Sequence, residues 1–581
     1  MADRHTQAGP SKTRLHLAAG IVALGALSAA GFAHAQSQPL PPEAAPRHEI
    51  ERRQQQEIEA QRERAQHRPD VLAPEAAPDA SGDLRLPTED PCFLIARVQW
   101  EAPAPPAGLR RAAEAVQGRC VGVQGLQQFQ KYLGELLIDA GLITTRVLVP
   151  EQSLADGTLT LRYMAGRIGV IRDEATPGWW RTALPTGPGG AVNQRDLDQA
   201  LENIRRLAGQ GDASIDLVPG TELGESDLQI KPGTGKRWHA NVGADNAGMN
   251  TTGKNQINAG LTLDSPLFLY DQLSASWNSN ADMGNGQAGA RAASVNYSVP
   301  VGYWSVFAGA SRSHYRQTVA GFDEPIVYGG TSKQIEAGVA VVPYRGAAYK
   351  GTASLKVLRK RANSTLNDID IEVQRRDVAG YEFSYGHRHY VGRAALDIGG
   401  GVRGVVPSRS NNVGYVLGDP DWDGRTLILS GNAGLYLPFT LAGQQMAYQG
   451  VAQIQHAKTP LVPADFFTIG NRYAVRGFDG QMTLAAEHGW SLRNDVSLNL
   501  DGAGLGGQQL YTGLDVGRVS GPSAEYLASR TLVGAVAGLR GRLPMPYVTA
   551  AYDLSAGWPL KKPDVLKAQS MVVAATLTFE F

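Results

Sequence analysis

The chain has few cysteines, no excess charge of either sign and no long apolar run beyond its N-terminal region. Its 55 Lys and Arg residues balance 55 Asp and Glu residues, so the total charge gives no reason to expect nucleic acid as a partner. Past residue 35, no apolar stretch approaches the ~18 residues that a membrane-spanning helix needs. If the mature chain crosses a membrane, it must therefore do so as a β-barrel.

The first 35 residues have the layout of a secretory signal peptide. Lys12 and Arg14 precede an apolar run, 15–32, and a small-residue A-x-A site follows at 33–35. Cleavage after Ala35 is predicted. A membrane anchor is the alternative, but the run is short and rich in glycine and alanine. No cysteine follows the site, which disfavours a lipoprotein.

A polar helix and a linker are expected next. Residues 46–68, within an N-terminal segment 36–68, consist of strong helix formers, and Ile50 and Ile58 are the only aliphatic side chains larger than alanine. Such a helix has no stripe for a core or a coiled coil, so it belongs in water or in a polar cavity. Residues 69–91 are rich in Pro, Ala, Asp and Glu, a composition that stays extended and buries little.

Two copies of a small α/β unit follow, expected at 92–167 and 168–235. Each copy has a strand, a helix with one apolar face and two more strands, which predicts an internal repeat. In the first copy these elements are expected at 92–100, 125–140, 146–149 and 158–163, and in the second at 168–171, 195–208, 214–218 and 225–230.

From about 236 to 581 apolar and small polar residues alternate with period two, and glycine-rich turns separate the alternating segments. Lipid outside and water inside a barrel would produce that pattern. At ~20 residues per strand and loop, the region predicts about sixteen strands, although alternation alone is also compatible with a soluble sandwich or propeller. The last strand places apolar residues on one face: Val573, Ala575, Leu577, Phe579 and Phe581.

Two late motifs indicate a family. Val475-Arg476-Gly477-Phe478 lies between two strand patterns, and Tyr511-Thr-Gly-Leu-Asp515-Val-Gly forms a later strand. With the preceding architecture, they make the chain resemble the transporters of two-partner secretion systems, of the haemolysin secretion/activation type. The resemblance covers essentially the whole mature chain. It implies a plug helix, two periplasmic POTRA domains and an outer-membrane barrel of about sixteen strands.

The resemblance also implies roles for residues. The tip at Val475, Arg476, Gly477 and Phe478 would lie on a loop folded back into the barrel, with Asp515 facing Arg476. Arginine suits this task because its planar fork can grip one carboxylate with two hydrogen bonds. The alternative is that Arg476 is a solvated loop residue. The terminal Phe581, with Phe579, resembles the signal that the barrel-assembly machinery reads in outer-membrane proteins.

The expected function is export of a large partner protein, a haemolysin, an adhesin or a contact-dependent toxin, from the periplasm to the cell surface. The resemblance implies that the two modules recognise the partner's N-terminal secretion domain. The exposed sheet edge of each module could accept a strand of an unfolded substrate, and the alternative is that the modules are rigid spacers. No cofactor, metal or catalytic activity is expected. The rivals are a barrel-assembly factor of the same superfamily and an outer-membrane barrel enzyme. Cys92 and Cys120 are expected to form a disulfide in the oxidising periplasm.

Several weaker signals in the sequence have plainer structural interpretations. Residues 502–507 match G-x-G-x-x-G, but a strand follows where a dinucleotide site needs a helix, so a tight turn is expected. His387 with His389, and Ser313 with His314, lack the further ligands or acid that a metal or nucleophile site requires. Trp179 and Trp180 are expected in the core of the second module rather than at a contact surface.

Overall fold

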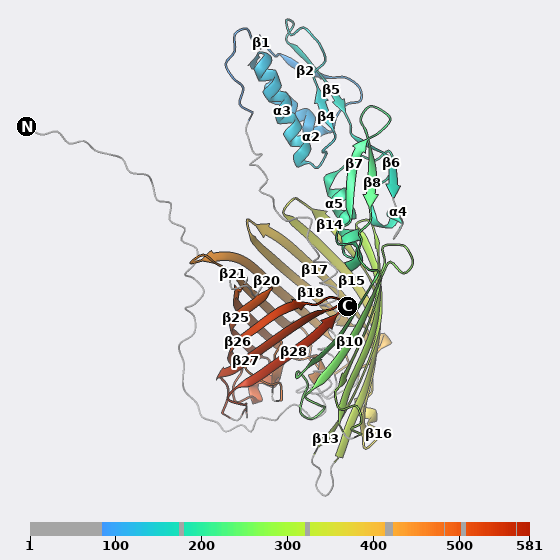
Figure 1. Ribbon diagram of the computed structural model, residues 1–581, viewed down its shortest axis with the longest axis vertical. Helices are drawn as coiled ribbons and strands as arrows, with labels where there is room; N and C mark the ends of the chain where they lie inside the picture. Colours follow the sequence, from blue (N-terminus) through green and yellow to red (C-terminus); the bar gives the residue numbers. More distant parts are fainter. Residues whose placement is uncertain are drawn as a thin grey trace, which may run out of the picture.

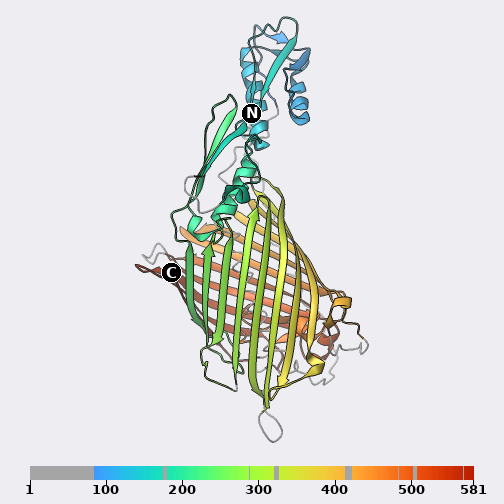
Figure 2. The same ribbon diagram turned by 90° about the vertical axis from the view of Figure 1, so that its right-hand side faces the viewer.

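The computed structural model describes residues 84–581 except 174–178, 287, 320–325, 413–421, 482, 501–506, 565 and 567. The expected signal peptide, the helix at 46–68 and most of the linker lie outside these residues. Two small α/β modules stand in line at one end of a large barrel (Figures 1 and 2). None of the described helices is long and apolar enough to cross a membrane.

The first module is a three-stranded sheet with helices packed on it. Strand β5 (Thr158–Met164) lies between β2 (Arg97–Trp100), to which it is parallel, and β4 (Arg146–Leu148), to which it is antiparallel. Helix α3 (Val123–Asp139) places Phe129, Leu133 and Leu137 at helical spacing in a core with Leu159 and Leu161. Apolar periodicity therefore fixes which face of α3 covers the sheet.

Three expectations for this module need correction. The strand expected at 92–100 is two pieces, β1 (Phe93–Leu94), which pairs with β3 (Cys120–Val121), and β2. A short helix, α2 (Ala107–Ala113), follows Pro106 and was not among the expected elements. The end of the linker is not free of contacts, since Leu84 and Leu86 pack against the core.

The second module repeats this order of elements. Strand β8 (Glu225–Lys231) lies between β6 (Arg167–Asp173), to which it is parallel, and β7 (Ser214–Pro219), to which it is antiparallel. Asn193 caps the N-terminus of helix α5 (Gln194–Arg205), because its side chain accepts a hydrogen bond from the Arg195 backbone N–H. The helix ends at Arg205 instead of Ala208, because a separate 3₁₀ turn, Ala208–Gln210, follows.

The C-terminal region is a closed antiparallel barrel. Two of its segments, β16 (Ile369–Asp370) and β19 (Asn411–Asn412), have only two residues, so sixteen long strands form the wall in the described part of the chain. In order around the barrel these strands are β9 (Trp238–Asp245), β10 (Gln256–Asp264), β11 (Gln272–Asn280), β12 (Gly289–Val301), β13 (Trp304–Val319), β14 (Ile326–Arg345), β15 (Tyr349–Leu366), β17 (Arg376–Val391), β18 (Ala394–Val405), β20 (Leu427–Leu441), β21 (Gln444–Ala457), β24 (His488–Asn499), β25 (Gln508–Ser520), β26 (Thr531–Pro544), β27 (Thr549–Lys561) and β28 (Val572–Glu580), which pairs with β9.

The alternation in the sequence separates the two faces of this wall. Trp277 and Val295, on the outward face, are 39% and 48% exposed, whereas Ser274 and Ser294, on the lumen face, are 8% and 3% exposed. Because successive strand residues point to opposite faces, one shift of register would turn every apolar side chain inward. The sequence pattern therefore specifies the barrel register.

The second module is docked on the mouth of the barrel. Tyr270, from the turn between β10 and β11, is fully buried within the module's hydrophobic core. At the turn between β14 and β15, Glu202 of α5 accepts hydrogen bonds from Lys350 Nζ at 2.6 Å and Arg345 Nη2 at 3.1 Å. Apolar burial and charge-assisted bonds together hold the module in one orientation at this end.

Candidate functional site

A loop folds back into the barrel between β21 and β24. Within it, β22 (Phe467–Ile469) pairs with β23 (Leu484–Ala486), and the loop tip lies between them in sequence. Val475 and Phe478 are 0% and 2% exposed and form an apolar cluster with lumen-facing residues such as Val519 of β25 and Leu532 of β26. The tip is thus packed against the inner wall rather than projecting into solvent.

Glycines in the wall and in the tip permit this close approach. A Cβ on Gly534 of β26 would lie 1.7 Å from the Arg476 carbonyl oxygen, and one on Gly517 of β25 would lie 2.8 Å from a Val475 methyl group. Gly477 has a φ of +97°, which side-chain-bearing residues rarely adopt, and its Cβ would lie 2.5 Å from the Trp558 carbonyl oxygen. The inner wall at Gly517 and Gly534, called here the seat, therefore has room for the backbone of the loop tip.

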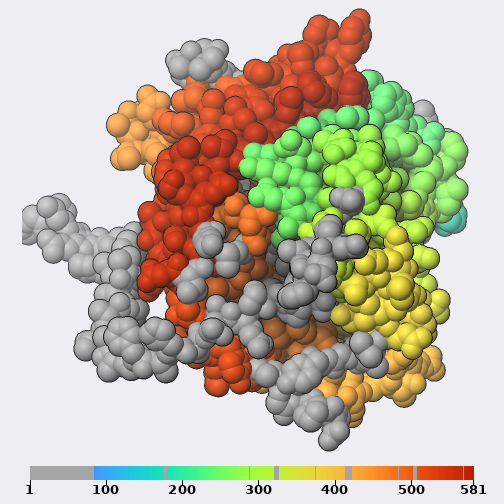
Figure 3. Space-filling model, turned by 90° about the horizontal axis from the view of Figure 1, so that it is seen from below, coloured from blue at the N-terminus to red at the C-terminus, as the bar shows by residue number. Residues whose placement is uncertain are grey.

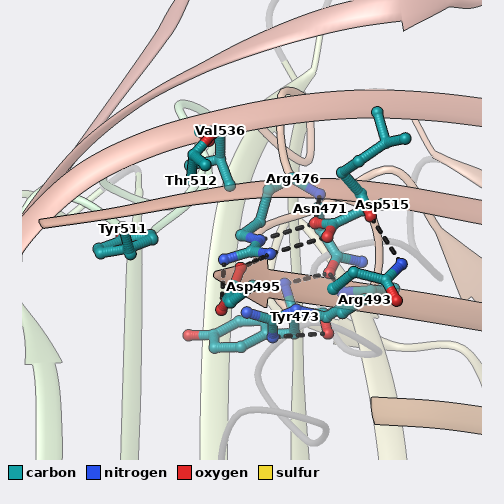
Figure 4. Close-up of polar contacts among 12 residues, drawn as sticks. Asn471, Tyr473, Arg476, Arg493, Asp495, Tyr511, Thr512, Asp515 and Val536 are labelled. Carbon is teal, nitrogen blue, oxygen red and sulfur yellow. Dashed lines mark hydrogen bonds and ion pairs between the residues drawn. The ribbon is translucent and has the colours of Figure 1, made fainter. Parts of the chain in front are cut away.

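Arg476 is the polar centre of the seat (Figure 4). Its Nε and Nη2 donate to the two carboxylate oxygens of Asp515 at 2.7 Å each, and its backbone N–H donates to Asp515 Oδ2 at 2.9 Å. Nη1 and Nη2 also donate to Asp495 on the neighbouring strand β24, with Nη1 at 3.1 Å from Oδ2. Asp515 is fully buried, and Arg476 and Asp495 are each 9% exposed. One guanidinium thus binds two carboxylates through its planar fork.

A second arginine completes the charge balance. Arg493 of β24 lies opposite Asp515 in the strand register, and its Nη1 donates to the Tyr473 carbonyl oxygen at 3.3 Å. Arg476, Arg493, Asp495 and Asp515, called here the lumen quartet, therefore carry no net charge. A neutral set of this kind limits the cost of burying four ionised groups.

Asp495 was missed as a partner of Arg476. The sequence does indicate that Asp495 faces the lumen, because the alternation in 491–499 places Asp495 and Arg493 on the polar side of the strand. The wall glycines at 513, 517, 534 and 557 were missed as well. They lie on lumen-facing positions of β25, β26 and β27, where a Cβ would collide with the tip or with the quartet.

A cavity of about 190 Å³ lies beside the quartet. It is lined by the loop tip, by the β9–β10 connection and by polar residues of β25 to β27, among which Tyr511 donates to Asp553 at 2.8 Å. A polar cavity of that size accommodates several water molecules. One side of the quartet is therefore next to solvent while the other is packed against the wall.

The remaining expected site residues lie elsewhere. Cys92 and Cys120 form a disulfide that ties β1 to β3, with their Cα atoms 5.4 Å apart. Phe579 is on the outward face of β28, opposite Val242 of β9, and the backbone N–H of Phe581 donates to the Ala240 carbonyl oxygen at 2.9 Å. The end of the chain thus contributes to the seam that closes the barrel.

The weaker sequence signals do not form functional sites in the described residues. Ser313 points into the lumen and His314 outward, so they form no dyad. His387 and His389 stack with Tyr349 on the outward face, and no group of three potential metal ligands occurs among the described residues. Residues 502–506 lie outside the described part. Trp180 packs against the second module's core as expected, but that expectation is wrong for Trp179, which is 51% exposed.

Comparison with known proteins gives a consistent result for the whole chain. Residues 224–541 match the family model described as haemolysin secretion/activation protein ShlB/FhaC/HecB. Residues 93–166 match the ShlB-type POTRA domain, and 167–219 match another POTRA model. The three matches follow the order of the two modules and the barrel.

Individual relatives agree over almost the full length. The chain is 32% identical over 580 residues to outer membrane transporter CdiB-2 of Burkholderia pseudomallei strain 1026b, covering 94% of this chain and 97% of that protein. It is 26% identical to hemolysin transporter protein ShlB of Serratia marcescens, with 88% of each covered. The solved structure of CdiB from Escherichia coli superposes with a TM-score of 0.82 at 25% identity, covering 94% of this chain and all of that one.

Proposed function

The chain belongs to the haemolysin secretion/activation family of outer-membrane transporters, and we propose that its returned loop is the element that couples partner recognition to passage through the barrel. The barrel lies in the outer membrane with the two modules in the periplasm, and it translocates an exported protein to the cell surface. The supporting observation is the lumen quartet, which attaches the loop tip to β24 and β25 inside the pore.

The docked second module gives the partner a defined route. Its sheet has β7 as one edge, and the first module has β4 as an edge in the corresponding position. An unfolded chain can add a strand at such an edge by main-chain hydrogen bonds, which suits a substrate that must stay extended. Glu202, Lys350 and Arg345 hold this module at the mouth, so a captured segment is presented directly to the pore.

The partner is a large exported protein with an N-terminal secretion domain, of the haemolysin, adhesin or contact-dependent toxin class. Transport needs no nucleotide in this proposal, because folding of the emerging chain outside prevents its return. Phe579 and Phe581 would serve as the segment that the barrel-assembly machinery recognises. In this proposal, a partner captured by the modules passes through the barrel only when the tip of the returned loop is bound to the barrel wall.

A substitution that unseats the tip without touching a charge tests this role. Gly534→Val inserts a side chain where the Arg476 carbonyl oxygen lies, and valine is favourable in a strand, so the barrel should still form. Gly386→Val is the matched control, because it is also on a lumen-facing strand position but has nothing within 4 Å of its Cβ. An exported partner with an N-terminal secretion domain would be co-expressed and quantified in the medium and at the surface.

We expect Gly534→Val to lower secretion at least tenfold while heat-modifiable, folded barrel remains at the wild-type level. Gly386→Val should secrete normally. Wild-type secretion by Gly534→Val, with the tip shown to be displaced, would refute a requirement for the seated loop.

A further inference from the structure

The outward face of the barrel has a marked change of chemistry along strands β12 to β15. From the module end, this face carries exposed apolar side chains such as Val306, Val339 and Val357. On β14 it extends from Tyr344 to Ile335, which is about 30 Å along the strand and about 23 Å along the barrel axis at a tilt of roughly 40°. That height matches the ~25 Å apolar band of outer-membrane barrels.

Immediately beyond this band the same face becomes basic. Six residues, called here the basic patch, lie on four adjacent strands: Arg291 of β12, Arg312 and Arg316 of β13, Lys333 of β14, and Arg359 and Arg361 of β15. In the strand register Arg312 lies opposite Lys333, which in turn lies opposite Arg361. Neighbouring strands are about 4.8 Å apart, so these three side chains occupy a row about 10 Å wide.

Few acidic groups compensate the patch. Asp377 of β17 accepts hydrogen bonds from Arg359 Nε at 2.8 Å and from Arg361 Nε at 3.1 Å, and Asp368 pairs with Arg316. Six cations and two carboxylates leave a formal charge of +4. Among the described residues, neither Arg312 nor Lys333 has an ion-pair partner in the structure.

The patch does not continue onto the strands that precede it in the barrel wall. The residues in corresponding positions on the strands before it, Ala244 of β9, Ile257 of β10 and Ser279 of β11, are uncharged. Strands β13 to β15 extend furthest from the modules (Figure 1), and the green to yellow segments lie together when that end faces the viewer (Figure 3). The modules are periplasmic, so this end is at the cell surface.

We propose that the basic patch binds the phosphate groups of an anionic glycolipid of the outer leaflet, of the lipopolysaccharide class. The position supports a membrane lipid, because a ligand whose acyl chains lie on the apolar band presents its headgroup at the height of the patch. Arginine recognises phosphate through paired N–H donors, and an unpaired lysine supplies a further mobile charge. The four-strand width lets several cations contact one headgroup.

Binding of purified full-length protein to lipid A tests the proposal. Fluorescent diphosphoryl lipid A in mixed micelles with a zwitterionic detergent would be titrated with wild type and with the triple variant Arg312→Gln, Lys333→Gln, Arg361→Gln. Each cation near an anionic lipid surface contributes about a fivefold factor in affinity, so the triple variant should bind on the order of 100-fold more weakly. Wild-type binding should weaken with salt and should fall when the lipid carries one phosphate or none.

The matched control is Arg110→Gln, Arg111→Gln, Lys131→Gln, which removes three exposed cations from the periplasmic first module. It should bind lipid A like wild type. Arg312→Lys with Arg361→Lys keeps the charge and should recover most of the affinity lost by the glutamine variant, which separates charge from folding. Heat-modifiability of each barrel is measured in parallel.

Other outcomes overturn the proposal. These are equal binding of phosphorylated and phosphate-free lipid, wild-type affinity in the triple variant, and an equal loss in the periplasmic control. Competition by soluble glucosamine 1-phosphate as effective as that by lipid A would indicate a free sugar phosphate instead of a membrane lipid. Because the assay contains no exported partner, its result is independent of the proposed role in secretion.

Discussion

Replacing Arg476 by alanine should release the returned loop from the barrel wall. The guanidinium makes four hydrogen bonds to two carboxylates, and its loss leaves Asp495 and Asp515 buried with Arg493 as the remaining nearby cation. Breaking a fully buried ion pair from one side costs about 3–5 kcal/mol. The adjacent polar cavity lets water reach the quartet, so we expect about 3 kcal/mol.

Hydrogen exchange measures this loss where it occurs. A decrease of about 3 kcal/mol in the free energy of local opening raises exchange of protected amides on the order of 100-fold. The effect should appear in 466–487 and at the facing segment of β25, while strands β10 to β15 keep wild-type protection. Arg472→Ala is the control, because Arg472 is on the same loop and donates only to the neutral side chain of Asn246.

A double-mutant cycle isolates the contact itself. Arg476→Ala and Asp515→Asn should each accelerate exchange of the loop, and the double variant should be less destabilised than their sum because no buried charge of that pair is left alone. Secretion of the partner should follow the same order, with normal surface levels of the transporter. Additive single effects, or unchanged loop protection in Arg476→Ala, would refute the reasoning.

Three further outcomes are expected. Thiol labelling of the denatured, unreduced protein should find no free thiol, and two labelled thiols would disprove the bond. Cys92→Ser with Cys120→Ser should destabilise the first module by about 3–4 kcal/mol, the chain-entropy value for a sequence separation of 28. Deleting 46–68 should raise single-channel conductance in planar bilayers with barrel assembly intact, and unchanged conductance would place this helix outside the lumen. Burial raises the pKa of the Asp173 carboxyl to about 6, above the ~3.9 of an unfolded chain. The ionised Asp173 carboxylate therefore destabilises the folded module, and this destabilisation is absent below pH 4 and complete above pH 6. Asp173→Asn should therefore stabilise the second module at pH 7 by about 1 kcal/mol, after allowance for solvent, and should have no effect at pH 4, as measured by exchange in 167–231.

The sequence was sufficient for the architecture because its signals are local. Period-two alternation predicts the strands and assigns the outward face from residues such as Trp277 and Val295, and helical spacing predicts α3 and α5 to within a few residues. The module interface was not predictable in this way. It depends on Tyr270, which reaches the second module's core from a barrel turn with a φ of +52°, and no periodicity marks such a residue.

The site was predicted in part. The resemblance identified Arg476 and Asp515, and the structure brings the two together. Asp495 was not distinguished, because many charged residues share the lumen-facing positions and only the spatial arrangement shows which one is adjacent to the loop. The wall glycines were missed for a similar reason: a glycine in a strand is common in this chain, and its role appears only when the backbone of another segment lies against it.

Asp495 changes what an exchange of the central pair should achieve. Arg476→Asp with Asp515→Arg restores opposite charges across that contact, which by itself predicts partial recovery. The new carboxylate at position 476, however, would face Asp495, and the new arginine on β25 would lie opposite Arg493 in the strand register. Both neighbours would then repel their new partners, so the exchanged protein should recover little of the loop protection and little secretion. Adding Arg493→Asp and Asp495→Arg inverts all four charges and removes both repulsions, although the fork geometry at Arg476 is not rebuilt. The quadruple variant should therefore exceed the double exchange in loop protection, and if the double exchange alone reaches the wild-type level, Asp495 has no energetic role in the seat.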